Sequence, residues 1–84
     1  MTNGTWTSIN NTSATQGQKN ALQEACKISV IHAIKKGWNV RLVVSDSNNG
    51  IVGTFTKERY GMTLPAGRIF IGKRGGIHAN ELTL

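Results

Sequence analysis

The sequence contains one cysteine, Cys26, among its 84 residues, so no disulfide can form within the chain. Cys26 lies among apolar residues in a predicted helix, where we expect a small buried side chain and not a reactive thiol. A single free cysteine suits a reducing compartment, and we therefore expect a cytoplasmic protein.

Long hydrophobic runs are also missing. The longest uninterrupted apolar run is three residues, whereas a membrane-spanning helix needs about 20. The first residues, rich in Thr, Asn and Ser, carry neither the basic start nor the apolar stretch of a signal peptide. We expect no membrane partner.

Acidic residues are scarce, and this is the strongest global signal of the sequence. Four Asp and Glu stand against ten Lys and Arg, which gives a net charge of +6. The stretch from Lys27 to Arg41 contains no acid, and the stretch from Lys57 to Arg74 contains five cations and only Glu58. This balance favours a polyanionic or phosphorylated partner.

The length indicates one small domain, and the pattern places it at residues 13–84 after a flexible arm at 1–12. The pattern of residues 13–36 predicts one long helix. Its start fits a capping box, either Ser13 with Gln16 or Thr15 with Gln18, and Gly37 is a natural stop. The β-branched second half of this segment predicts broad burial if it is helical, and a strand is the alternative.

Three strands are predicted after the helix. Residues 38–45 alternate apolar and polar, the Asn-Gly pair at 49–50 predicts a turn, and residues 51–56 return, with Gly53 marking a bulge or a close approach. We expect a linker or a short turn of helix at 57–65, a turn at 64–67, a third strand at 68–71 and a short terminal helix or strand at 77–84.

The predicted fold class is therefore α+β, with one long N-terminal helix packed on a three-stranded antiparallel sheet and a short C-terminal element. The sheet face away from the helix, which carries Arg41, Val43 and Thr54, would meet solvent or a partner.

A glycine-rich basic loop follows the third predicted strand. Gly72, Gly75 and Gly76 permit positive φ angles, so backbone N–H groups could converge on an anion, with Lys73 and Arg74 adding charge. The segment RIFIGKRGG resembles the loop with which KH-type RNA-binding domains hold a nucleic-acid backbone. That family places the loop between two helices. Here RIFI reads as a strand and eight residues follow Gly76, so we keep only the looser interpretation of a phosphate-binding loop.

The segment GGIHANEL resembles the metal-binding segment of zinc carboxypeptidases, in which His78 and Glu81 would be ligands. A third ligand could come only from the other histidine, His32, so we expect no metal and no cofactor. The two histidines with Glu58, Glu81, Lys73 and Arg74 also supply the residue types of a metal-independent ribonuclease. His32 lies in an apolar run, where a core or interface histidine is the usual outcome.

Aromatic residues are few. Tyr60 beside Arg59, and Phe70 between Arg68 and Lys73, are the candidates for stacking on bases, whereas Trp38 and Phe55 suit the core.

We expect binding and not catalysis: a small basic protein that holds the phosphates of a nucleic acid or a phosphorylated nucleotide. The predicted contacts are Lys57, Arg59, Arg68, Gly72, Lys73, Arg74, Gly75 and Gly76. The alternatives are an inhibitor of the phage or mobile-element type that binds a host protein, and a ribonuclease toxin. The apolar helix further predicts a homo-oligomer.

Overall fold

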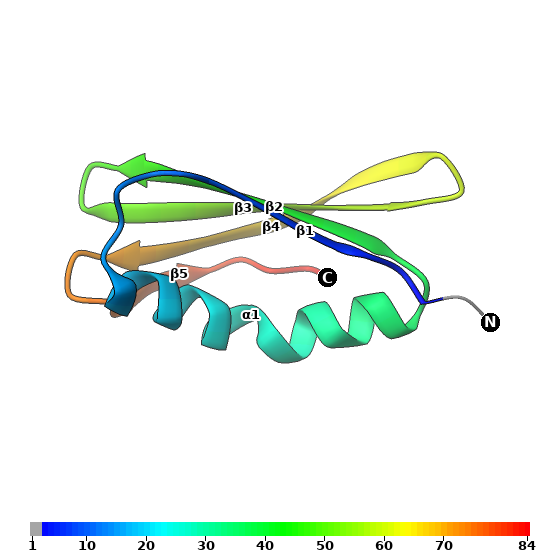
Figure 1. The fold of residues 1–84 in the computed structure, drawn as a ribbon, viewed down its shortest axis with the longest axis horizontal. Coiled ribbons are helices and arrows are strands. Elements are labelled where there is room, and N and C mark those ends of the chain that lie inside the picture. The colour runs from blue at the N-terminus through cyan, green and yellow to red at the C-terminus, as the bar shows by residue number, and fades with distance from the viewer. Residues whose placement is uncertain (1–2) are drawn as a thin grey trace.

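The computed structural model describes residues 3–84, which form one helix and one five-stranded sheet. The elements in chain order are β1 (Trp6–Asn11), α1 (Gln16–Lys35), β2 (Asn39–Ser47), β3 (Gly50–Arg59), β4 (Met62–Gly72) and β5 (Ile77–Asn80). The fold is α+β, with α1 lying along one face of the sheet (Figure 1). The prediction of a three-stranded antiparallel sheet with an N-terminal helix was wrong: the sheet has five strands, is mixed, and begins before the helix.

The first strand, β1, lies in the segment expected to be an arm. It pairs in parallel with β2, from Trp6 opposite Val40 to Asn11 opposite Ser45. Two parallel strands need a crossover, and α1 supplies it. The strand was missed because its partner lies 34 residues away along the chain, and its own residues show little apolar alternation.

Thr15 caps the start of α1: its side chain accepts a hydrogen bond from the Gln18 backbone, while the Gln18 side chain accepts one from the Thr15 backbone. This confirms the second of the two capping boxes considered. The β-branched half is helical, because Val30 and Ala33 are buried against the sheet. Within the single chain this half is buried on one side only, since Ile28 is 73% exposed and Ile31 is also exposed.

Strands β3 and β4 form a long hairpin where a linker and a turn were predicted. The tip is a two-residue turn with positive φ at Tyr60 (55°) and Gly61 (77°), as in the primed turns that fit twisted strands. A β-bulge sets one β3 residue, Phe55, opposite two β4 residues, and it sits beside Pro65. A bulge is a place where a sheet tolerates proline, so Pro65 does not end the strand. The hairpin tip extends past the end of the helix-covered sheet (Figure 1).

The core lies between α1 and the covered face of the sheet. Its buried residues are Leu22, Cys26, Val30 and Ala33 from the helix, and Val40, Leu42, Val44, Ile51, Phe55, Ala66, Ile69 and Ile71 from the strands. The predicted core positions of Cys26 and Phe55 are confirmed. A Cβ on Gly53 would lie 3.0 Å from the side chains of both Leu22 and Leu42, which confirms the predicted close approach there.

The opposite face of the sheet is open. Arg41 and Thr54 are exposed on it, and Val43 is half-buried among its strand neighbours. The molecule measures 40 × 19 × 19 Å. Within residues 3–84, no helix has the length and apolarity needed to cross a membrane.

Candidate functional site

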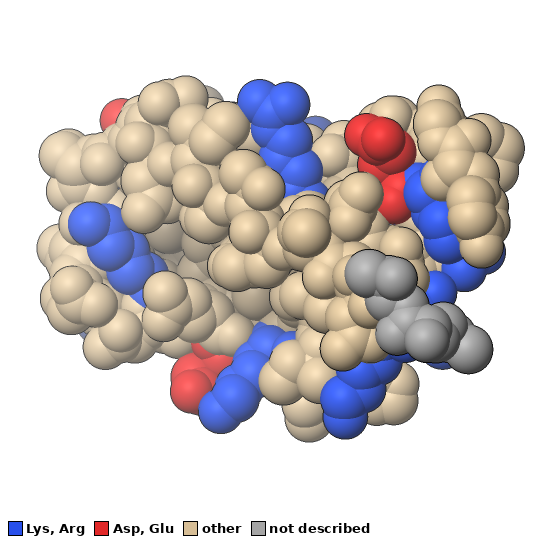
Figure 2. Space-filling model, turned by 45° about the vertical axis from the view of Figure 1, so that its right-hand side comes forward, with Lys and Arg blue, Asp and Glu red and all other residues tan. Residues whose placement is uncertain are grey.

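The cations predicted to bind phosphate lie at two ends of the sheet and not in one patch. Gly72, which precedes Lys73 and Arg74, pairs with Gly50 at one end of β3. Lys57 is seven residues further along β3, or about 23 Å away at the usual rise of a strand. Arg68 lies between these ends, on the open face of the sheet. Figure 2 shows Lys and Arg side chains dispersed over the visible surface, with few acids among them.

The turn that joins β4 and β5 (residues 72–76) carries Lys73 and Arg74, both exposed. The Gly75 N–H donates to the Gly72 carbonyl at 2.9 Å, and the Gly72 N–H donates to the Gly76 carbonyl at 2.8 Å. Gly75 has φ of 88°, a conformation for which glycine is suited. Two of the N–H groups that were expected to face an anion thus donate hydrogen bonds within the turn. Binding of an anion here would therefore depend mainly on the two cationic side chains.

The turn is held in place by the start of the helix. Gln18 is buried, and its Nε2 donates to the Gly72 carbonyl at 3.2 Å. The imidazole of His78 lies against Gly72, where a Cβ would collide with it. Lys73 and Arg74 therefore project from a backbone that is fixed on two sides.

The other end of the molecule carries what we call the hairpin cluster: Trp38, Lys57, Arg59 and Tyr60. Lys57 Nζ lies 4.7 Å from the centroid of the Trp38 ring, and Arg59 Cζ lies 4.2 Å from it. Arg59 Nη1 also donates to the Lys36 carbonyl at 3.1 Å, next to the end of α1. Cation–π contacts of this kind hold the two charges in defined positions.

Tyr60 occupies the tip of the hairpin, 90% exposed, with Arg59 Cζ 5.3 Å from its ring centroid. Its neighbours across the tip, Met62 and Leu64, are exposed as well. Trp38, which was expected in the core, is half-buried: it packs against the core and also contacts the two cations. No local sequence signal reveals this cluster, because it depends on the register between β2 and β3, which sets Lys57 opposite Val40, two residues after Trp38.

The open face holds the second stacking candidate. Phe70 is half-buried, and Arg68 Cζ lies 5.4 Å from its ring centroid. Arg68 also pairs with Glu81 at 3.6 Å, with both side chains more than half exposed. That contact is the one ion pair found in residues 3–84, so the other nine Lys and Arg side chains there have no acidic partner.

The histidines do not come together. His78 lies against Gly72, which Gln18 contacts, whereas His32 is 14 residues along the helix from Gln18, or about 21 Å at the helical rise. One chain therefore cannot place both imidazoles on one phosphate. Across residues 3–84, no three His, Cys, Asp or Glu side chains are grouped so as to hold a metal ion.

Burial raises the pKa of the Cys26 thiol above its ordinary value of 9.0, and a smaller, opposite effect comes from hydrogen bonding to the backbone of Cys26 itself. The thiol is protonated at neutral pH, so Cys26 is not poised to act as a nucleophile.

Comparison of the chain with known protein families, with curated proteins and with solved structures finds no match. The functional argument therefore depends on the chemistry of the surface described above.

Proposed function

We propose that this chain is a non-enzymatic, cytoplasmic nucleic-acid-binding protein that contacts a single-stranded phosphate backbone at both ends of its sheet. The observation that carries the proposal is that cations without acidic partners lie at two fixed sites. Lys57 and Arg59 lie in the hairpin cluster, and Lys73 and Arg74 lie in the β4–β5 turn. Cations spaced along an elongated molecule suit an extended polyanion better than one small phosphate.

The preference for a single strand comes from the aromatic side chains. Proteins that bind single strands combine basic grooves with exposed rings on which unpaired bases stack. Tyr60 presents such a ring beside Arg59, and Phe70 offers a second beside Arg68. Stacked bases are buried within a duplex, where neither ring could reach them without distorting it.

Salt dependence of binding tests the proposal. We would measure the affinity of a labelled single-stranded RNA, a single-stranded DNA and a DNA duplex by fluorescence anisotropy between about 50 and about 200 mM salt. Each double variant, Lys57→Ala/Arg59→Ala and Lys73→Ala/Arg74→Ala, should weaken binding to the single strands. Each should also reduce the slope of log K against log salt by about 1.4, because two phosphate contacts are lost at about 0.7 each.

A matched control removes the same charge elsewhere. Lys19→Ala/Lys27→Ala deletes two helix cations that belong to neither of the two proposed sites. If this variant weakens binding as much as the other two, the attraction depends on net charge alone and the two-site proposal is wrong. Tyr60→Ala should cost about 1–3 kcal/mol with a single strand and little with a duplex.

A further inference from the structure

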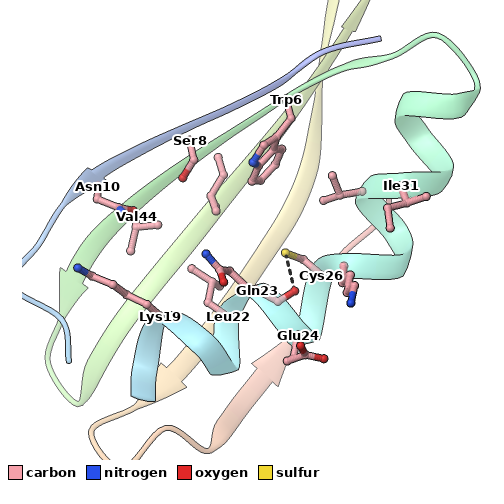
Figure 3. A pocket seen from close by; sticks show the side chains of 13 residues that line it. Trp6, Ser8, Asn10, Lys19, Leu22, Gln23, Glu24, Cys26, Ile31 and Val44 are labelled. Carbon is pink, nitrogen blue, oxygen red and sulfur yellow. Dashed lines mark hydrogen bonds between the residues drawn. The ribbon is translucent and has the colours of Figure 1, made fainter. Parts of the chain in front are cut away.

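A groove of about 370 Å³ runs between β1 and α1, on the face of the sheet that the helix covers. Its floor is apolar, formed mainly by Leu22, Cys26, Val30, Leu42 and Val44. Figure 3 shows the side chains of β1 pointing across it toward the helix.

The strand beside the groove has an unpaired edge. β1 is the first strand of the sheet and pairs only with β2. The Val40 N–H donates to the Thr5 carbonyl at 2.8 Å, so the backbone groups of alternate residues from Thr5 onward point toward β2. Those of Trp6, Ser8 and Asn10 consequently point outward, while their side chains line the groove.

This edge has none of the usual protection against pairing. Natural edge strands are commonly blocked by charged residues, proline or bulges. Residues 6–11, Trp-Thr-Ser-Ile-Asn-Asn, contain no charge and no proline, and their register with β2 is unbroken. A partner strand could therefore add to β1 and direct alternate side chains toward the groove.

We propose that β1 and the groove form a docking site for an extended segment of another protein, in which apolar and acidic residues alternate. The apolar side chains would occupy the groove. The acidic side chains, which alternate with the apolar ones, would lie on the open face of the sheet, where Arg41 is exposed opposite Thr7 of β1, and the net charge of +6 favours them as well. Strand addition of this kind takes affinity from backbone hydrogen bonds and specificity from pockets for alternate side chains.

A second copy of this chain fits the site less well. Its β1 would bring Trp6, Ser8 and Asn10 to the groove side, and two of these three are polar. Two chains of charge +6 would also repel one another.

The test uses a synthetic peptide, Leu-Glu-Val-Glu-Leu-Glu-Val, labelled for fluorescence anisotropy. The wild-type chain should bind it and should bind the version with Lys in place of Glu at least about tenfold more weakly. Ser8→Pro removes an outward N–H without touching the β2 ladder and should weaken binding by about tenfold, the usual worth of one or two net hydrogen bonds. Ser8→Ala keeps the N–H and should bind like the wild type.

Two further outcomes decide the matter. If Ser8→Pro does not fold, as judged by circular dichroism, a peptide N-methylated at alternate residues replaces it and should lose binding to the wild-type chain. Equal binding by the Ser8→Pro and wild-type chains, or by methylated and unmethylated peptides, overturns the proposal. So does a wild-type dimer in sedimentation that Ser8→Pro converts to monomer, because the occupant would then be a second copy.

Discussion

Gly53 lies where β3 passes directly beneath Leu22 of the helix. The space for a side chain at this position is taken by two leucines, one from α1 and Leu42 from β2. The contact lets the helix lie close to the sheet at the centre of the core.

Replacing Gly53 with Val should therefore destabilise the protein. Overpacking a well-filled core costs about 1–3 kcal/mol, and we expect a loss in this range in the free energy of unfolding measured with urea. Gly76→Ala is the control, because a Cβ there meets nothing within 4 Å, and it should change stability by less than about 0.5 kcal/mol. Equal effects of the two substitutions would show that the Gly53 contact is not tight.

At the scale of the elements, Gln18 joins the start of α1 to the β4–β5 turn. Its Oε1 accepts from the Thr15 N–H at 2.9 Å and its Nε2 donates to the Gly72 carbonyl, so one buried side chain caps the helix and holds the β4–β5 turn. The position of Lys73 and Arg74 thus depends on a residue far from them in the sequence.

Gln18→Ala should cost about 2 kcal/mol of unfolding free energy, since it removes half a capping box and leaves a buried carbonyl with one fewer partner. The amides of the turn should also exchange faster with deuterium in native-state measurements. Gln16→Ala, which loses only an exposed bond to Asn20, should be close to neutral. If the amides of the β4–β5 turn exchange at the same rate in both variants, Gln18 does not hold the turn.

Local signals predicted some elements well. The Thr15–Gln18 capping box, the turn before Gly50 and the alternation of β2 each depend on residues close together in the chain, and each is present in the structure. The β3–β4 hairpin was missed because Pro65 and Gly67 suggest a turn. Only the pairing of the two strands shows that they belong to a bulge.

The candidate site was predicted in part for the same reason. The sequence identifies the basic residues and the exposed Tyr60, but treats them as one cluster because they are close in the chain. A strand moves two residues apart by about 3.3 Å for every step between them, so cations at opposite ends of β3 and β4 cannot share one phosphate. The stacking of Lys57 and Arg59 on Trp38 depends on strand register, which the sequence does not specify at that distance.

At the scale of the whole molecule, the pairs of neighbouring strands differ in how far apart they lie in the sequence. β2, β3, β4 and β5 form a meander in which each strand pairs with the next across a short turn. Past β5 the chain still follows β4, with the Thr83 N–H donating to the Ala66 carbonyl at 2.9 Å. β1 alone pairs across the whole helix.

This difference has a consequence for the order in which the protein folds. Contacts between residues far apart in the chain require the closure of a long loop, which is slow and entropically costly. We expect the meander and α1 to assemble first and β1 to dock last, and β1 to open first in the native state. Pulsed hydrogen exchange during refolding should protect β2–β4 amides before those of β1. Simultaneous protection would show that the sheet forms in a single step.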